Sequence, residues 1–248
     1  MPDQPRKVAL VTGAAAGIGR ACAIRFARRG LDVVVNYSRS EKEAREVVGE
    51  VEGQGAQALL YQCDVSGNAA VCRMIDAIDQ KFGRLDVVVN NAGTTKFIDH
   101  RDFDALTEDV WDRILAVNVK GPFFVTRAAA PLMRRGGGGA IVNTSSVAGV
   151  SGGGSSIAYA ASKGALNTMT KSLARALAPE IRVNTVCPGP VDTRWLKGYE
   201  ELVNKQLAMT PLGKSATPDD IADTILYLAL DTTHTVGQCL VVDGGRTM

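Results

Sequence analysis

The chain has 248 residues, of which 46% are hydrophobic and 22% charged, a composition typical of globular proteins. Its 28 lysine and arginine residues nearly balance 26 aspartate and glutamate residues, and no basic run exceeds a pair, which argues against nucleic-acid binding. No apolar run approaches the roughly 20 residues of a membrane helix, and residues 1–7 lack a secretory signal. We therefore expect a cytoplasmic protein whose residues 1–248 form a single domain, with no nucleic acid or membrane partner.

Short apolar runs alternate with helical stretches along the whole chain. The predicted elements, in chain order, are strand Lys7–Thr12, helix Ile18–Arg29, strand Asp32–Tyr37, helix Glu41–Glu52, strand Ala56–Gln62, helix Asn68–Phe82, strand Leu85–Asn90, helix Trp111–Arg134 with a bend near Gly121-Pro122, strand Ala140–Thr144, helix Tyr159–Leu177, strand Arg182–Cys187, helix Pro218–Ala229 and strand Cys239–Val242. Strands such as Asp32–Tyr37 are apolar on both faces, so helices should cover both sides of the sheet. This order predicts an α/β fold with a doubly wound parallel sheet of about seven strands.

Local signals mark two helix starts and two glycine-rich connections. Ser40 and Glu43 have the spacing of a capping box, and Thr217-Pro218-Asp219-Asp220 places a cap, a proline and two acids in order. Residues 136–139 connect a helix to a strand, and residues 152–154 form a segment that we expect to be mobile.

The cysteines and histidines give no sign of a metal site. Five cysteines are scattered without a Cys-x-x-Cys pair, and the chain has only two histidines. We therefore expect reduced thiols and no bound metal.

A glycine-rich turn joins the first strand to the first helix. Gly13, Gly17 and Gly19 are spaced G-x-x-x-G-x-G, so the backbone can closely approach a ligand. The N–H groups and dipole of the following helix favour a pyrophosphate at this turn. Helix–strand packing alone is the alternative explanation of these glycines.

Four motifs resemble the short-chain dehydrogenase/reductase family over nearly the whole chain. They are Thr12-Gly13-x-x-x-Gly17-Ile18-Gly19, Asn90-Asn91-Ala92-Gly93, Tyr159-x-x-x-Lys163 with Ser146 upstream, and Pro188-Gly189 followed by Thr193. The resemblance implies a seven-stranded Rossmann-type sheet, a nicotinamide cofactor, and hydride transfer between an alcohol and a carbonyl. It also implies an oligomer, commonly a tetramer and otherwise a dimer, that pairs the helices carrying Asn118 and Tyr159 and joins along the last strand.

The predicted catalytic residues are Asn118, Ser146, Tyr159 and Lys163. Tyr159 and Lys163 are four residues apart on a helix and share a face. An ammonium group near a phenol lowers the pKa of the phenol, so Tyr159 could act as acid or base. By resemblance, Lys163 also holds the nicotinamide ribose, Ser146 polarises the substrate oxygen, and Asn118 completes a proton relay with water and lysine. Outside this context, these residues could be a surface pair, a strand-end serine and a core amide.

Cofactor choice depends on the residues after the second strand. Where NAD-dependent relatives carry an aspartate, this chain has Tyr37, followed by Ser38 and Arg39, which can donate to a 2′-phosphate. NADP(H) is therefore favoured over NAD(H), although Ala16 stands where many NADP-dependent relatives have a basic residue. Arg39 could instead be a solvated loop charge. Asp64 and Val65 resemble the pair that contacts adenine, and Asp64 could instead cap the following turn.

The remaining cofactor contacts are predicted after the fourth and sixth strands. By resemblance, Asn91, Ala92 and Gly93 follow the fourth strand, while Pro188, Gly189, Val191 and Thr193 meet the nicotinamide carboxamide and a phosphate. Residues 194–210 form a predicted helical lid whose apolar residues could equally pack in the core: Trp195, Leu196, Tyr199, Leu202 and Leu207.

The substrate class is less defined by the sequence. Residues 211–222 and 241–245 resemble those of 3-oxoacyl-acyl-carrier-protein reductases, and they are also common in reductases of sugars, steroids and simple ketones. An acidic carrier protein docks on basic residues, but the corresponding positions here are Gly137 and Glu180, with Arg134, Arg135 and Arg182 nearby. The principal expectation is an NADPH-dependent oxidoreductase acting on a small carbonyl or alcohol substrate. Alternatives are a 3-oxoacyl-acyl-carrier-protein reductase specifically, a reductase specialised for a secondary metabolite, and a non-catalytic NADP-binding sensor or scaffold.

Overall fold

The computed structural model describes residues 6–248, apart from the side chains of Glu200 and Leu202; the first five residues of the segment expected to lack a signal lie outside it. Within the described part of the chain, seven strands form one parallel sheet in the order β3-β2-β1-β4-β5-β6-β7. The strands are β1 (Val8–Val11), β2 (Asp32–Tyr37), β3 (Ala58–Gln62), β4 (Val87–Asn90), β5 (Gly139–Thr144), β6 (Ile181–Pro188) and β7 (Cys239–Val242). The predicted fold class is confirmed.

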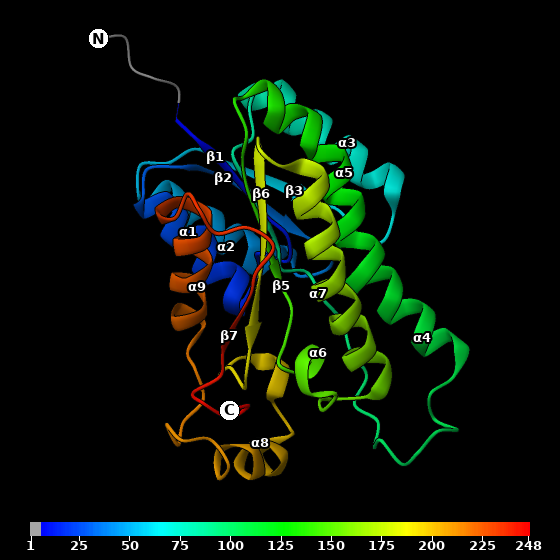
Figure 1. The fold of residues 1–248 in the computed structure, drawn as a ribbon. Helices are drawn as coiled ribbons and strands as arrows, with labels where there is room; N and C mark the ends of the chain where they lie inside the picture. Colours follow the sequence, from blue (N-terminus) through cyan, green and yellow to red (C-terminus); the bar gives the residue numbers. More distant parts are fainter. Residues whose placement is uncertain (1–5) are drawn as a thin grey trace.

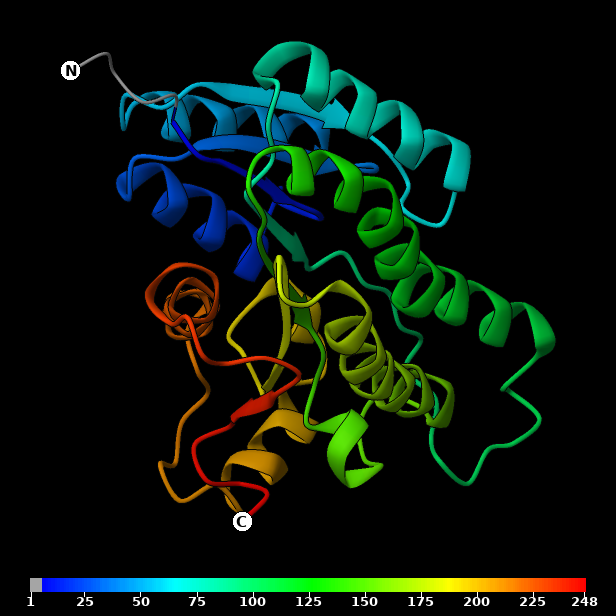
Figure 2. The same ribbon diagram turned by 45° about the horizontal axis from the view of Figure 1, so that its top comes forward.

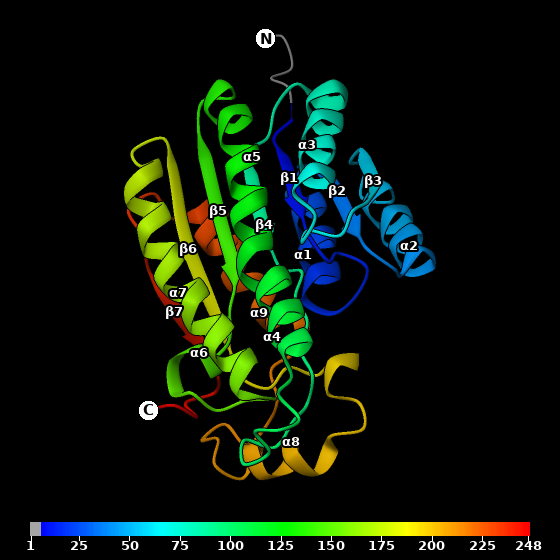
Figure 3. The same cartoon turned by 90° about the vertical axis from the view of Figure 1, so that its right-hand side faces the viewer.

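Helices cover both faces of this sheet (Figures 1 and 3). The helices are α1 (Gly17–Arg28), α2 (Glu41–Glu52), α3 (Asn68–Phe82), α4 (Glu108–Leu115), α5 (Gly121–Arg135), α6 (Ala148–Ser151), α7 (Ile157–Leu177), α8 (Glu200–Leu207) and α9 (Pro218–Leu226). Within residues 6–248, no helix has the length and apolar character needed to cross a membrane.

The central strands bury alternate residues in two separate apolar layers. In β1, Ala9 and Val11 belong to the layer under α1, α2 and α9, whereas Val8 and Leu10 belong to the layer under α3, α5 and α7. The two layers explain why the strand sequences lack polar alternation, because both faces of a doubly covered parallel sheet are dry.

The long helix predicted over Trp111–Arg134 is interrupted differently from the expectation. It starts at Glu108, and a π-helical turn at Ala116–Lys120 separates α4 from α5, which begins at Gly121. The structure therefore replaces the bend expected at Gly121-Pro122 with a wider turn just before it. This turn carries Asn118, and π-helical turns inside helices often mark functional positions.

The two predicted helix starts have opposite outcomes. At α9, the Thr217 hydroxyl accepts from the Asp220 backbone N–H at 3.2 Å, and the Asp220 carboxylate accepts from the Thr217 N–H at 2.7 Å. At α2, the prediction is wrong: the Ser40 side chain makes no cap hydrogen bond, and its hydroxyl instead accepts from the Arg194 guanidinium at 3.1 Å. A tertiary partner thus replaces the local one.

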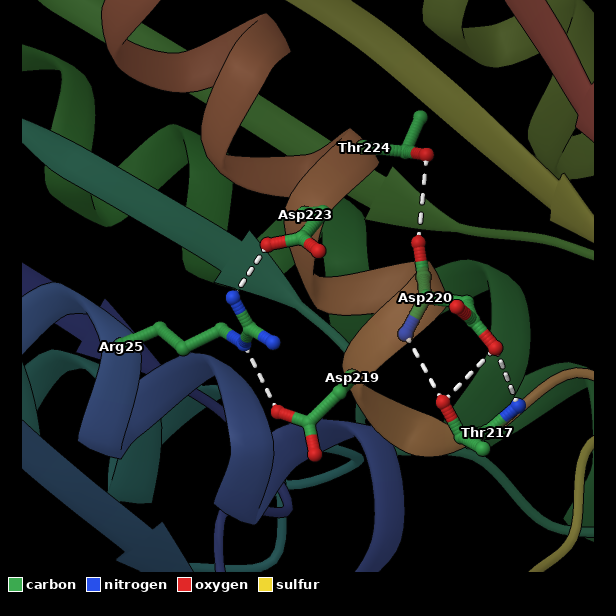
Figure 4. Close-up of polar contacts among 6 residues, drawn as sticks. All are labelled: Arg25, Thr217, Asp219, Asp220, Asp223 and Thr224. Atoms are coloured by element: carbon green, nitrogen blue, oxygen red, sulfur yellow. Dashed lines mark hydrogen bonds and ion pairs between the residues drawn. The ribbon is translucent and has the colours of Figure 1, made fainter.

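Figure 4 shows how the start of α9 is also bound to α1. Arg25 of α1 donates to Asp219 at 2.7 Å and also to Asp223, one turn further along α9. These contacts hold the last helix against the first, although the two are nearly two hundred residues apart in sequence. Because the carboxylates are largely exposed, we expect the ion pairs to contribute little stability beyond orientation.

A chain of buried polar side chains fastens α7 to the middle of the sheet. Asn90 of β4 donates to Asn143 of β5 at 2.9 Å, and Asn143 donates to the Thr170 hydroxyl of α7 at 2.8 Å. The Thr170 hydroxyl lies 2.6 Å from that of Thr185 on β6. All of these residues are buried, so each lost partner leaves an unsatisfied polar group.

We expect Thr170→Val to lower the free energy of unfolding by about 1–3 kcal/mol, because the isosteric change leaves the buried Asn143 amide without its acceptor. Urea unfolding measures the change. Thr168→Val is the matched control, since Thr168 is exposed on the same helix, and should change stability by less than about 0.5 kcal/mol. Equal effects of the two substitutions would contradict the role of this polar chain.

Candidate active site

A cavity of about 680 Å³ lies at the carboxyl ends of the strands. The neighbouring strands β1 and β4 lead the chain in opposite directions across the sheet, which is where doubly wound folds bind ligands. Of the predicted site residues, the cavity wall includes Gly13, Gly17, Ile18, Tyr37, Ser38, Arg39, Asp64, Val65, Asn91, Ala92, Gly93, Ser146, Tyr159, Lys163, Pro188, Gly189, Val191 and Thr193. Gly19 and Asn118 are outside this set, and their contacts place them beside it.

The glycine-rich turn presents the start of α1 to this cavity. Gly13 and Gly17 have positive φ angles of 64° and 54°, which favour glycine. The N-terminus of α1 has no side-chain cap and no acidic residue in its first turn. A Cβ on Gly17 would lie 3.2 Å from the Thr193 methyl group, so a side chain would fill the gap between the glycine-rich turn and the loop after β6. The arrangement suits an anionic ligand.

Gly19 and the Asn91 side chain support the turn from beneath. A Cβ on Gly19 would collide with the Gly13 carbonyl oxygen and come within 2.6 Å of the Asn91 amide nitrogen. That nitrogen donates to the carbonyls of Thr12 and Gly13 at 3.1 and 3.2 Å. Gly19 therefore permits close packing of α1 on the glycine-rich turn. The Asn91 side chain holds the same turn, and Asn91 also borders the cavity.

Two further polar residues support the turn, and neither of them was assigned a role of its own from the sequence. The Thr12 hydroxyl accepts from the backbone N–H groups of Asn91 and Ala92 at 3.0 and 3.1 Å. The Asn36 carboxamide accepts from the Gly13 N–H at 3.3 Å and donates to the Cys63 carbonyl at 3.1 Å. The sequence feature that could have indicated both residues is a polar side chain at the end of an otherwise apolar strand.

The segment after β2 forms one end of the cavity. Tyr37 is buried, whereas Ser38 and Arg39 are exposed. In the turn after β3, the Asp64 carboxylate accepts from the Ser66 N–H at 3.0 Å and lies 2.9 Å from the Arg113 guanidinium. Burial raises the pKa of Asp64, but these hydrogen bonds outweigh burial and lower the pKa overall. Asp64 thus caps its local turn and also borders the cavity.

Tyr159, Lys163 and Ser146 converge at the middle of the cavity. Tyr159 lies in the first turn of α7, where the Ser156 hydroxyl accepts from its N–H at 3.3 Å. One helical turn later, the Lys163 ammonium donates to the Thr144 carbonyl at 2.8 Å and lies 5.6 Å from the centre of the Tyr159 ring. Ser145, adjacent to Ser146, donates to the Lys163 carbonyl at 3.1 Å and so supports the helix.

The electrostatics of the pair differ from the sequence expectation. Burial raises the pKa of Tyr159 to about 12, and the hydrogen bond with Ser146 only partly offsets it. Burial also lowers the pKa of Lys163 to about 8. The expected lowering of the tyrosine pKa by lysine is absent because desolvation dominates and the ammonium is directed to a backbone carbonyl. At neutral pH, Tyr159 carries its proton and can donate it.

Asn118 lies in the π-helical turn, and its side-chain amide makes three hydrogen bonds. Its oxygen accepts from the Thr94 N–H at 2.8 Å, and its nitrogen donates to the Thr94 carbonyl at 2.9 Å and the Ser162 hydroxyl at 3.0 Å. A Cβ on Gly93 would lie 3.5 Å from the Asn118 oxygen and 3.7 Å from the Lys163 nitrogen. Gly93 therefore leaves space between Asn118 and Lys163.

The predicted lid contains a short helical turn at Arg194–Leu196 and then α8. The Trp195 ring centre is 6.3 Å from that of Tyr159, and Tyr199 stacks on Phe97 with ring centres 3.6 Å apart. Trp195 and Tyr199 are each 40% exposed, which fits a cover over the cavity better than core packing. The Leu202 side chain lies outside the described residues. Val203, Gln206 and Arg246 also line the cavity and were not predicted.

We expect a pH titration to show no Tyr159 phenolate until the pH approaches 12, because the buried site disfavours the charged phenol. The measurement is the near-ultraviolet absorbance of phenolate in the free protein, from which the titration of Tyr159→Phe is subtracted. A phenolate signal at neutral pH in that difference would show that Lys163 dominates over burial.

Known proteins resemble this chain over almost its whole length. Residues 13–247 match the family model described as enoyl-(acyl carrier protein) reductase. A candidate ketoacyl reductase 2 of the granaticin polyketide synthase from Streptomyces violaceoruber is 41% identical over 98% of this chain and 96% of its own. The 3-oxoacyl-acyl-carrier-protein reductase FabG of Thermotoga maritima is 38% identical, covering 96% and 97%. The crystal structure of a candidate short-chain dehydrogenase/reductase from Burkholderia xenovorans superimposes with a TM-score of 0.93 at 37% identity, covering 98% and 99%. The chain therefore belongs to the short-chain dehydrogenase/reductase family of oxidoreductases, which act on C=O and CH–OH groups.

Proposed function

We propose that this protein reduces a carbonyl group to a secondary alcohol with NADPH, and that Tyr159 donates the proton. The observation that carries the proposal is that Ser146, Tyr159 and Lys163 line the same cavity as the glycine-rich turn at α1. One cavity can therefore hold a phosphate-bearing cofactor and a reacting carbonyl side by side.

The residues present fit a nicotinamide dinucleotide. The uncapped N-terminus of α1 suits the pyrophosphate, and the gap that a Cβ on Gly17 would fill is open to it. Ser38 and Arg39 would hold a 2′-phosphate, Asp64 and Val65 the adenine, and residues 188–193 the nicotinamide carboxamide. Lys163 would hold the ribose. When bound, NADPH supplies the hydride.

The catalytic side chains have distinct roles in this proposal. The Ser146 hydroxyl donates a hydrogen bond to the substrate oxygen and polarises the carbonyl. The Tyr159 phenol, protonated at neutral pH, gives its proton to the same oxygen. Lys163, with a pKa of about 8, still carries a proton at neutral pH and can replace the lost one. The space at Gly93 suits a water that joins Lys163 to Asn118.

The opposite direction uses the same groups. In alcohol oxidation, Tyr159 must first lose its proton, which the buried site disfavours. The free protein is thus better prepared to reduce a carbonyl than to oxidise an alcohol.

A second, narrower candidate is reduction of a 3-oxoacyl thioester on an acyl carrier protein. The names of the relatives from Streptomyces violaceoruber and Thermotoga maritima favour it. The docking positions considered from the sequence, Gly137 and Glu180, precede β5 and β6 and so lie at the sheet edge opposite the cavity. Glu180 is 4.0 Å from Arg134 and partly neutralised. Within this chain, these positions therefore do not flank the cavity, and Glu180 gives no argument against the carrier.

Two accompanying properties belong to the proposal. A cytoplasmic location fits the five free thiols. A homo-oligomer fits the partly exposed apolar residues Leu240 and Val241 on the edge strand β7 and Phe123 on α5, the elements expected at its interfaces. A non-catalytic sensor or scaffold on the same fold is the alternative that turnover of any carbonyl would exclude.

We expect Tyr159→Phe to lower kcat by about 10²- to 10⁴-fold and leave NADPH affinity unchanged, because only the proton donor is lost. Loss of NADPH absorbance with a short 3-oxoacyl thioester measures turnover, and cofactor fluorescence measures binding. A panel of sugars, steroids and simple ketones tests the broader reductase. Near-normal turnover by the variant would remove Tyr159 from the proton-transfer role.

We expect Arg39→Ala to weaken NADPH binding by about 10- to 100-fold and NADH binding much less, because only NADPH offers a 2′-phosphate. Fluorescence titration with each cofactor gives the two Kd values. Arg45→Ala is the matched control, because Arg45 is exposed on α2 and pairs with Glu41 outside the cavity wall. Equal weakening of both cofactors by Arg39→Ala would show that Arg39 does not contact the phosphate.

A further inference from the structure

The charged side chains of the cavity wall divide into satisfied and unsatisfied groups. The wall contains Arg39, Asp64, Arg113, Lys163, Arg194 and Arg246. Asp64 pairs with Arg113, Arg194 contacts Ser40 and Glu43, and Lys163 donates to a backbone carbonyl. Within residues 6–248, the guanidinium groups of Arg39 and Arg246 have no ion pair. These two cations remain available to a ligand.

The two unpaired arginines belong to opposite parts of the sheet. Arg39 follows β2, on the side of the sheet that we assign to the cofactor phosphate. Arg246 follows β7, at the other edge of the sheet, and Ser146 follows β5, which is two strands away from β7. Only β6 separates β5 from β7, so their ends are about 10 Å apart. Figure 1 shows the chain after β7 close to α8, at the end of the molecule that carries the lid. Arg246 is therefore on the substrate side.

The turn that carries Arg246 is firmly held. The Asp243 carboxylate accepts from the N–H groups of Gly245 and Thr247, each at 2.9 Å, and from the Thr247 hydroxyl at 2.7 Å. A Cβ on Gly189, directly after β6, would lie 2.9 Å from the Asp243 Cβ, so the turn that carries Arg246 packs on the loop after β6. Asp243 and Arg246 form no ion pair in the described part of the chain.

Arg246 also has an unsatisfied donor. Its Nε atom is buried and has no hydrogen-bond partner in the described part of the chain. A buried N–H without an acceptor is unfavourable, and a guanidinium is matched in shape by the two oxygens of an oxyanion. The same wall contains Trp195 and Val203, which are apolar, and Gln206, which is uncharged. Arg246 is thus the one cation that we find unpaired at this end of the wall.

We infer that Arg246 binds an anionic group of the ketone substrate, a carboxylate or a phosphate, and so selects acidic ketones over neutral ones. The inference rests on the proposed carbonyl reduction and adds the substrate's charge to it. The carbonyl would lie at Ser146 and Tyr159, and the anion would lie toward β7 and the lid. A carboxylate close to the ketone fits the short span between β5 and β7, whereas the phosphodiester of a carrier arm lies farther from its carbonyl.

The test compares paired substrates that differ only in charge. Acetoacetate is compared with its methyl ester, and acetoacetyl-phosphopantetheine with acetoacetyl-pantetheine, in wild type, Arg246→Met and Arg246→Lys. We expect Arg246→Met to lower kcat/KM for the charged member of one pair by about 10- to 100-fold and leave the uncharged member nearly unchanged. Arg246→Lys should restore part of the loss. The pair that responds identifies the carboxylate or the phosphate as the source.

Arg73→Met is the matched control, because Arg73 is exposed on α3 outside the cavity wall. Equal losses for charged and uncharged substrates in Arg246→Met, or no loss for either, would overturn the inference. If wild type turns over none of the four, the proposed reaction fails for these ketones. Calorimetric binding of acetoacetate and of acetoacetyl-phosphopantetheine to the NADPH-loaded protein then decides about Arg246, because unchanged affinity in Arg246→Met for both would still contradict its role.

Discussion

The parallel alignment of seven strands under helices on both faces is the constraint from which the site follows. A parallel strand can be continued only through a crossover, and each crossover leaves the sheet at its carboxyl end. The segments after all seven strands therefore meet along one edge, and the cavity wall is drawn from all of them. The apolar layers hold the strands and helices together, so side chains distant in sequence share one surface.

Burial rather than charge pairing sets the protonation of the reacting groups. The hydrogen-bonded residues Asn90, Asn143, Thr170 and Thr185 fasten α7 to the sheet, and α7 carries Tyr159 and Lys163. Desolvation then raises the pKa of the phenol and lowers that of the ammonium, each toward its neutral form. A neutral phenol is a proton donor, so the Tyr159 side chain can give up a proton in the free protein.

The pairing of charges around the cavity gives it two distinct ends. An arginine that is paired with a carboxylate, as Arg113 is with Asp64, forms part of the cavity wall and has its charge offset by its partner. Where it has none, as in Arg39 and Arg246, it remains open to a ligand anion. Arg194 has an intermediate position, because its contacts with Ser40 and Glu43 connect the lid to the start of α2 across the cofactor side. The lid is thereby in direct contact with the start of α2.

The sequence by itself determined the order of elements, the parallel sheet and the motif positions, because these depend on local patterns: apolar runs, glycines at a strand end, and a Tyr-x-x-x-Lys spacing on one helix face. Tertiary structure decided what depends on partners far along the chain. Arg194 removes the local cap expected at Ser40, from 154 residues away. Gly19 supports the turn because Gly13 and Asn91 pack on it. The phenol of Tyr159 is kept neutral by burial, and Arg246 lines the cavity from the turn after the last strand. Neither property can be predicted from neighbouring residues, because both depend on segments that are distant in sequence.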